Sequence, residues 1–176
     1  NVERKIDIGG IHVELGNEEK AEQYFDLAVK QATKVTLDYI KDISLKIADI
    51  YVDKDPERAE KYYRGALDVK RGMLDESDLE TFNRLGINLR RQGKWEEAIA
   101  EYKKALRISP KDEGLYFNTA MAQAEGKSFE DSAESLRKAL KLNPEFHKTD
   151  PLLCNHIGTI FVKVGAYKEA REFLQE

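Results

Sequence analysis

Cysteine is nearly missing from the sequence, with Cys154 alone among 176 residues. One thiol cannot form an intrachain disulfide framework and cannot by itself make a thiolate metal site. Proline and glycine are also scarce, at 4 and 11 residues, which argues against a disordered or fibrous chain. Apolar runs stay as short as Ile160-Phe161-Val162, whereas a membrane-spanning helix requires roughly 20 apolar residues. We therefore expect an ordered, helix-rich protein with no membrane span.

The charge balance gives little support to a nucleic-acid partner. The formal net charge is −4, so the molecule as a whole repels phosphate backbones. The only local basic feature is the group Arg84, Arg90, Arg91 and Lys94. The single cysteine favours the cytoplasm. The chain starts at Asn1 with neither an initiator methionine nor an apolar secretory segment, so we expect a piece excised from a longer protein. We expect no nucleic-acid partner.

The sequence repeats an alternation of large and small residues along nearly its whole length. The clearest copy consists of Phe82, Leu85, Gly86, Leu89, Gly93, Trp95, Ala98, Tyr102, Ala105 and Pro110. The pattern returns from Tyr116 to Pro144, from Cys154 to Ala170, near the N-terminus from Ile8 to Ala28, and more weakly from Ser44 to Ala66. Apolar residues at three- and four-residue intervals give each predicted helix one buried stripe. We therefore predict an all-α fold of antiparallel helical hairpins.

The spacing divides the chain into about four and a half repeats within a single domain over residues 1–176. The predicted repeats are 2–36, 37–74, 78–112, 113–147 and a truncated 151–176. The break between the first two repeats, near Thr33 to Asp38, contains neither glycine nor proline and is predicted from the repeat alignment alone.

Candidate capping residues agree with this periodicity. Ser77 and Glu80 have the spacing of a capping box, and Asp55 and Asp150 each precede a proline at a predicted first helical turn. Asn17 and Ser128 are further candidate N-caps.

These residues resemble the tetratricopeptide repeat, a 34-residue helical hairpin with W-x2-L-G-x2-Y, A-x3-F and P elements. The match is strongest at Phe82-x2-Leu85-Gly86-x2-Leu89 and Ala98-x3-Tyr102. The resemblance implies a right-handed superhelical solenoid whose concave groove, lined mainly by the first helix of each hairpin, grips peptides or proteins. Two intervals depart from the pattern, with 38 residues from Ala21 to Ala59 and 39 from Ala59 to Ala98. Longer helices or a bend are expected there.

Catalytic and metal-binding patterns are missing. The three histidines, at positions 12, 147 and 156, are scattered among repeats without other ligands at metal spacing. Cys154 occupies a slot filled by Phe82 and Tyr116 in sister repeats, which predicts a packing thiol. The aromatic slot of Trp95, Phe129 and Tyr167 predicts packing between hairpins. We expect no enzyme activity, no cofactor and no metal.

The family resemblance implies the candidate binding surface. In this family, residues beside the buried stripe of each first helix face the concave groove. These residues are Asn83, Arg84, Ile87, Arg91, Phe117, Asn118, Met121, Asn155, His156 and Thr159. Asparagine can donate to and accept from a peptide backbone, and arginine can bind a carboxylate through two donors. This half of the groove is therefore predicted to hold an extended segment with an acidic or C-terminal anchor, although an ordinary solvated helix face is the alternative.

The corresponding positions of the N-terminal repeats are mostly acidic. They comprise Glu3, Asp7, Glu14, Asp42, Lys46, Asp49 and Asp53. The contrast with the basic C-terminal positions predicts a bipolar groove that sets the direction of a bound partner.

The sequence favours a protein-protein interaction scaffold that binds a peptide or partner protein. Two alternatives stay open at this point. One is a regulatory or adaptor portion of a larger, bacterial-style signalling protein. The other is a self-assembly module in which the open end of the repeats packs on a second copy, giving a homo-oligomer.

Overall fold

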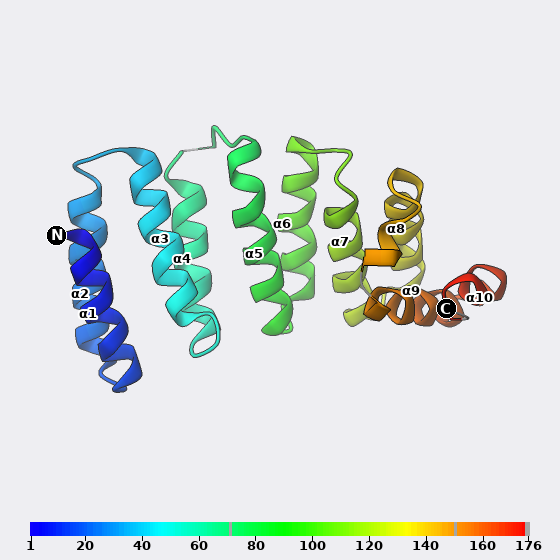
Figure 1. The fold of residues 1–176 in the computed structure, drawn as a ribbon, viewed down its shortest axis with the longest axis horizontal. Coiled ribbons are helices and arrows are strands. Elements are labelled where there is room, and N and C mark those ends of the chain that lie inside the picture. The colour runs from blue at the N-terminus through cyan, green and yellow to red at the C-terminus, as the bar shows by residue number, and fades with distance from the viewer. Residues whose placement is uncertain (71, 150, 175–176) are drawn as a thin grey trace. The chain divides into compact units, whose positions relative to one another are not determined.

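The computed structural model describes residues 1–70, 72–149 and 151–174, and within these ranges it contains helices and no strand (Figure 1). The chain divides into two compact units, Asn1–Gln92 and Gly93–Glu176. The first contains α1 (Val2–Glu14), α2 (Glu18–Ala32), α3 (Leu37–Tyr51), α4 (Pro56–Asp68), the 3-10 turn η1 (Glu76–Asp78) and α5 (Leu79–Arg91). The second contains α6 (Trp95–Ile108), α7 (Glu113–Glu125), α8 (Phe129–Leu142), the 3-10 turn η2 (Phe146–Thr149), α9 (Pro151–Lys163) and α10 (Tyr167–Leu174). The predicted all-α repeat fold is confirmed.

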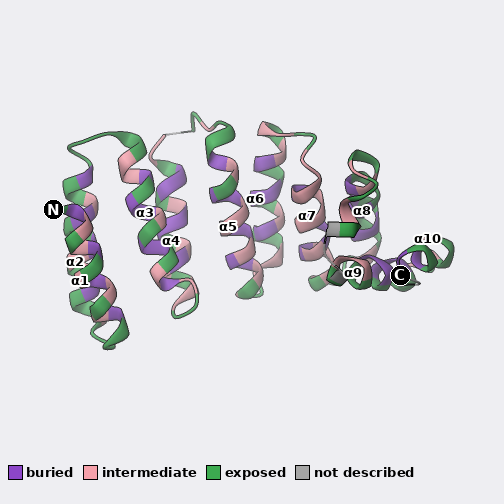
Figure 2. Cartoon of the chain, viewed as in Figure 1, coloured by how far each residue is buried: buried purple, intermediate pink, exposed green. Residues whose placement is uncertain are grey.

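In the first unit, α1 packs against α2 and α3 against α4, and α5 packs on α4. Helices α1 to α4 show buried residues along one side and exposed residues on another, whereas the exposed residues of α5 lie near its ends (Figure 2). Small residues allow the close packing of α1 against α2, because a Cβ atom added at Gly9 would overlap the ring of Phe25. Ala21 and Ala28 are fully buried on the α2 side of the same interface. Small residues opposite large ones thus fix this hairpin.

In the second unit, α7 packs against α8 and α9 against α10, with α6 against α7. The core cluster joins both hairpins through Ala133, Leu136, Ile157 and Phe161, among others. Gly158 has the role that Gly9 has in the first hairpin, because a Cβ atom there would overlap Leu174. Neighbouring hairpins therefore share one core, as stacked repeats must.

The helix boundaries confirm some of the predicted caps and correct others. The break predicted near Thr33 to Asp38 is present, with α2 ending at Ala32 and α3 capped by Thr36. Asp55 caps α4 by accepting from the Arg58 amide at 3.0 Å. Neither Asn17 nor Ser128 makes a side-chain cap hydrogen bond, although they stand at the starts of α2 and α8.

The capping box predicted for Ser77 and Glu80 is wrong. The box lies two residues earlier, where Asp75 caps η1 and the Asp78 carboxylate accepts from the Asp75 amide at 2.9 Å. Aspartate at both positions outcompetes the serine, whose hydroxyl instead accepts from two lysines. Asp150, the remaining predicted cap, lies outside the described residues.

The added length of the first repeats lies partly in the helices. Both α2 and α3 have 15 residues, whereas α1 and α4 have 13. The prediction of longer helices is confirmed for this pair. In the second unit, the added residues form η2, between α8 and α9.

The recurring aromatic slot does not behave alike in every repeat. Trp95 and Phe129 are half-buried, and Lys163 lies 5.9 Å from the centroid of the Phe129 ring. Tyr167 is 69% exposed, so the packing expected of this slot is wrong there.

Candidate protein-interaction surface

Four of the predicted groove residues lie on α5, on the side of that helix that carries its arginines. Arg84 Nε donates to Glu80 at 2.8 Å, and Arg84 Nη1 donates to both carboxylate oxygens of Asp49 on α3, at 3.0 and 3.1 Å. Hydrogen bonding to Glu80 and the charge of Asp49 outweigh partial burial and raise the pKa of Arg84. The guanidinium predicted to bind a partner is thus already held by two carboxylates of its own unit.

Arg91 on α5 is paired in the same way. Its Nη1 donates to Asp53, just after α3, at 2.9 Å, and the side chain stays exposed. The remaining α5 candidates, Asn83 and Ile87, are half-buried.

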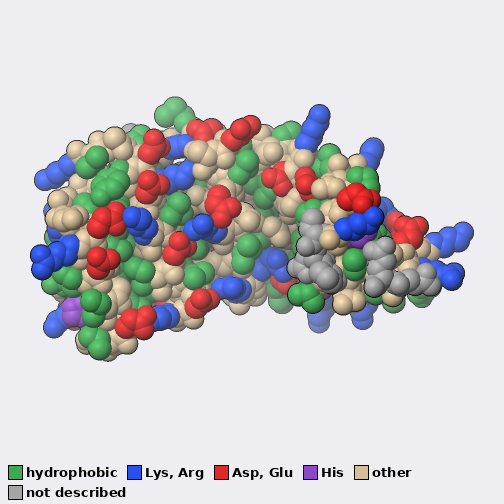
Figure 3. Space-filling view, in the orientation of Figure 1, with side chains coloured by type: hydrophobic (Ala, Val, Ile, Leu, Met, Phe, Trp, Pro, Cys, Tyr) green, Lys and Arg blue, Asp and Glu red, His purple; other side chains and the backbone are tan. Residues whose placement is uncertain are grey.

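Four of the six acidic first-helix positions of this unit are paired with bases. Lys46 on α3 donates to Glu3 on α1 at 2.8 Å, and Lys54 forms an ion pair with Glu14. Together with the pairs of Asp49 and Asp53, these contacts link α1, α3 and α5. Figure 3 shows acidic and basic side chains interspersed over this unit. Local pairing therefore reduces the acidic field that the sequence suggested for these helices.

The α7 candidates are partly structural. Phe117 and Met121 pack against the core cluster of the second unit, and the Phe117 ring lies 5.4 Å from that of Phe146 in η2. Asn118 is half-buried between them on the same helix. Removing Phe117 would therefore disturb the packing of α7 as well as any binding surface.

The α9 candidates are the most accessible. Asn155, His156 and Thr159 are all exposed, whereas the neighbouring Ile157 and Ile160 are buried in the core cluster. The exposed side of this helix thus combines these polar side chains with Leu152 and Val162, which are 63% and 42% exposed. The α7 and α9 candidates belong to the second unit and the α5 candidates to the first.

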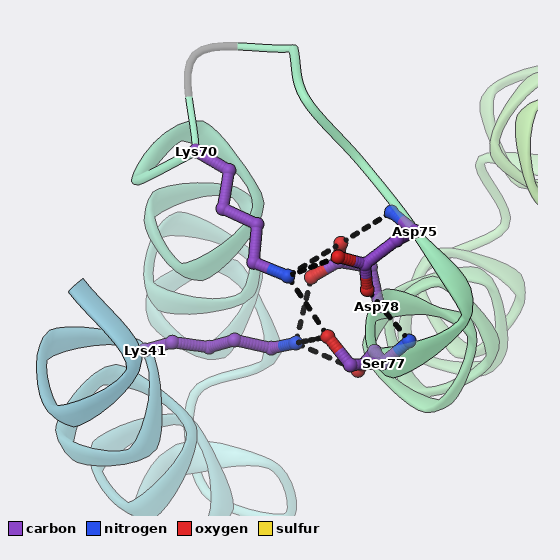
Figure 4. A network of polar contacts seen from close by, with 5 residues as sticks. All are labelled: Lys41, Lys70, Asp75, Ser77 and Asp78. Atoms are coloured by element: carbon purple, nitrogen blue, oxygen red, sulfur yellow. Dashed lines mark hydrogen bonds and ion pairs between the residues drawn. The ribbon is translucent and has the colours of Figure 1, made fainter.

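A buried ion-pair network in the first unit was not predicted (Figure 4). Lys41 on α3 donates to Asp78 at 2.6 Å and to the Ser77 carbonyl at 2.6 Å. Lys70, just after α4, reaches the other oxygen of Asp78 at 3.3 Å and Asp75 at 3.0 Å. The network therefore ties α3 and the end of α4 to the start of α5.

The network shifts the pKa values of its carboxyl groups. Burial alone would raise the pKa of Asp78, but hydrogen bonds from Lys41, the Asp75 amide and Lys70 outweigh burial and lower it. Hydrogen bonds from Ser77 and Lys70 lower the pKa of Asp75 to about 2. The sequence carried two signals of this arrangement: a lysine within the buried stripe of α3, and two aspartates at capping-box spacing.

Two of the histidines, His12 and His147, and the cysteine have packing surroundings. His12 stacks on Tyr24 with ring centroids 5.6 Å apart, and His147 meets Phe173 edge-on at 5.1 Å. Cys154 is half-buried against the core cluster, with its Sγ 3.7 Å from the His147 carbonyl oxygen. Among the described residues, no group of three or more His, Cys, Asp or Glu is placed to hold a metal ion. None of the described helices is long and apolar enough to cross a membrane.

Comparison with known families matches the hairpins directly. The tetratricopeptide repeat model matches residues 3–34 and 114–146, and a second TPR repeat model matches residues 88–126. The chain belongs to the tetratricopeptide repeat family. A relative from Arabidopsis thaliana, the TPR repeat-containing thioredoxin TTL4, is 24% identical over 98 residues. That match covers 56% of this chain and 14% of the relative.

Several solved structures share the fold at low sequence identity. BtubC (BKLC) from P. vanneervenii superposes with a TM-score of 0.73 at 18% identity, covering 99% of this chain and 77% of its own. MamA from Desulfovibrio magneticus RS-1 gives 0.68 at 18% identity, with 99% and 91% covered. YrrB, described as a TPR protein with an unusual peptide-binding site, gives 0.64 at 16% identity, with 97% and 81% covered. These similarities show the fold alone. The matches to the tetratricopeptide repeat models support a protein-protein interaction scaffold in general.

Proposed function

We propose that this chain is a non-enzymatic scaffold, each of whose two units binds peptide or protein segments along the first helices of its hairpins. The contacting residues are Asn83, Arg84, Ile87 and Arg91 on α5, Phe117, Asn118 and Met121 on α7, and Asn155, His156 and Thr159 on α9. The observation that carries the proposal is the accessible face of α9, where Asn155, His156 and Thr159 are exposed beside a buried stripe of the same helix.

Amide side chains suit this role because each can satisfy a donor and an acceptor of a peptide backbone. Asn83, Asn118 and Asn155 supply one amide on each of the three first helices. The description of YrrB as having a peptide-binding site adds a precedent for peptide binding within the same fold.

The arginines of α5 give the proposed surface a preference for carboxylates. Arg84 forms ion pairs with Asp49 and Glu80, and the exposed fractions of these three side chains are 38%, 51% and 64%. Exposed ion pairs contribute about 0–1 kcal/mol each, so a partner carboxylate can replace Asp49 at little cost. The internal carboxylates then act as competitors that keep non-specific acidic segments from binding tightly.

A capture experiment tests the first-helix assignment. Lysate from the source cell is applied to the immobilised chain and to a variant carrying Asn83→Ala, Asn118→Ala and Asn155→Ala. The matched control carries Lys103→Ala, Glu130→Ala and Arg171→Ala, three exposed residues of the second helices α6, α8 and α10. Circular dichroism checks that both variants are folded.

We expect a specific partner to be retained by the wild type and the control and lost by the asparagine variant. A partner lost only by the control, or retained equally by all three proteins, would overturn the assignment to the first helices.

A second candidate is that these repeats form the adaptor portion of a larger protein. The observation that favours it is the match to a TPR repeat-containing thioredoxin of which this chain covers only 14%. The capture experiment also addresses this candidate, because an adaptor would recover a substrate or regulator of the larger protein. The alternative of self-assembly predicts instead that the captured protein is a second copy of the chain.

A further inference from the structure

Two open grooves lie between second helices, one in each unit. The first, of about 570 Å³, lies among α2, α4 and the start of α3. The second, of about 520 Å³, lies among α8, α10, η2 and α9. Both are distinct from the first-helix residues of the proposed peptide surface.

The two grooves are built from the same repeat positions. Six residues that line the first groove each have a counterpart lining the second groove, 111 positions later in the sequence. The pairs are Asp26 with Arg137, Val29 with Leu140, Lys30 with Lys141, Thr33 with Pro144, Lys61 with Glu172, and Tyr62 with Phe173. The shared chemistry is an aliphatic residue, an aromatic ring and a lysine.

Both grooves occur where consecutive second helices are 38 residues apart. The interval from Ala21 to Ala59 is 38 residues, and the interval from Ser132 to Ala170 is also 38. The four residues beyond a 34-residue repeat lengthen α2 and α3 in the first unit and form η2 in the second.

The lysine is the only charged residue type that recurs at the same position. Neither Lys30 nor Lys141 makes an ion pair with a described residue, whereas Lys61 is paired with Glu22 and Arg137 with Glu169. The carboxylates without an ion pair to described residues, Asp26 and Glu172, stand at different positions. The common element is thus one available cation beside an apolar floor.

We propose that both grooves bind the same kind of partner, a short peptide segment with an aliphatic or aromatic side chain next to a single carboxylate. The apolar side chain lies on Val29 and Tyr62 in the first groove and on Leu140 and Phe173 in the second. Its carboxylate pairs with Lys30 or Lys141. The unpaired carboxylate of each groove disfavours a run of acids, which makes a lone carboxylate the preferred motif.

Gly65 on α4 supplies an independent reason to expect a close approach to the first groove. It lines the groove in the middle of a helix, and a Cβ atom there would meet nothing within 4 Å. A helix-interior glycine is unfavourable relative to alanine, and here no contact within the unit requires it. A partner backbone packed closely against α4 would account for a glycine at this position.

Peptide selection followed by calorimetry tests the proposal. A random dodecapeptide phage library is selected on the whole chain, and the enriched peptide is titrated against wild type and variants. We expect enriched peptides to carry Asp or Glu next to an apolar residue and to bind at two sites per chain. Gly65→Phe fills the first groove and should leave one site.

The lysine variants separate the two grooves. Lys30→Glu and Lys141→Glu should each weaken one of the two sites about tenfold or more, a difference of about 1.4 kcal/mol. Lys20→Glu on α2 and Lys168→Glu on α10 are matched controls, because both lysines are exposed and lie outside the grooves. Both controls should keep two sites of unchanged affinity.

Three results would overturn the proposal: no enriched peptide, enriched peptides without a carboxylate, or a stoichiometry and affinity unaffected by Gly65→Phe and by both lysine reversals. If circular dichroism shows that Gly65→Phe is unfolded, Lys30→Glu against Lys20→Glu decides the first groove. Loss of the first-helix asparagines should leave this binding intact, so failure here is distinguishable from failure of the scaffold proposal.

Discussion

Burial should make one lysine of α3 far more important for stability than another. Lys41 and Lys46 are on the same helix and each contacts a carboxylate at similar distance, 2.6 Å to Asp78 and 2.8 Å to Glu3. Their side chains differ in exposure, with 9% and 0% for Lys41 and Asp78 against 52% and 46% for Lys46 and Glu3. The two pairs therefore form a natural comparison of a buried with an exposed ion pair.

Lys41→Met should destabilise the first unit by about 3 kcal/mol, because it leaves a buried carboxylate with one fewer charged donor. The estimate lies at the low end for a broken buried pair since Lys70 and the Asp75 amide still reach Asp78. Lys46→Met should cost less than about 1 kcal/mol, as is usual for an exposed pair.

The assay is native-state hydrogen exchange of the α3 and α5 amides, because stability in repeat proteins varies along the chain. The pKa of Asp78 is lowered in the folded protein, so its contribution is complete above the unfolded value of about 3.9 and is lost as pH falls through the lower folded value. The difference between wild type and Lys41→Met should therefore be constant near neutral pH and shrink under acid. Equal costs for the two lysine variants would refute the reasoning.

Further predictions concern glycine, tyrosine and the α5 arginine. Gly65→Ala should stabilise the protein by about 0.5–1 kcal/mol in urea denaturation, whereas Gly9→Ala should destabilise it, because its Cβ atom overlaps Phe25; the reverse order would contradict the packing. Burial and the Asp49 charge raise the pKa of Tyr63 to about 12. Its contribution to the free energy of unfolding is therefore complete below about pH 10 and is lost as pH rises toward 12. If Tyr63→Phe shows the same dependence of stability on pH over this range, the prediction is wrong. Asp49→Asn should change the free energy of unfolding by no more than about 1 kcal/mol. It should strengthen binding of an acidic partner, because it removes a carboxylate that competes for Arg84. Fluorescence anisotropy with the captured partner measures the affinity, and weaker binding would argue that Asp49 itself contacts the partner.

The fold could be predicted from the sequence because packing in repeats depends on residue size at regular positions. Ala21, Ala59 and Ala98 are fully buried where the pattern placed small residues. The break between α2 and α3 could be located without glycine or proline, since the alignment of sister repeats marks it. Cap identity was harder, because Asp75 and Ser77 both have suitable side chains and only the path of the chain decides between them.

The candidate surface was less accessible to sequence reasoning because it depends on which side chains find each other. Arg84 and Asp49 are 35 positions apart in the sequence. Nothing in that spacing predicts that the two side chains form an ion pair. Phe117 occupies a predicted groove position, but η2 supplies a ring for it to pack against. The grooves between second helices were not predicted either, although both lie where the repeat is longer than 34 residues.

Hydrogen exchange of the captured complex tests the central claim most directly. With a bound partner, amides of the first helices α5, α7 and α9 should exchange more slowly, and the asparagine variant should abolish that protection. Unchanged exchange in all three helices while the partner is bound would contradict the assignment of the interaction surface to the first helices.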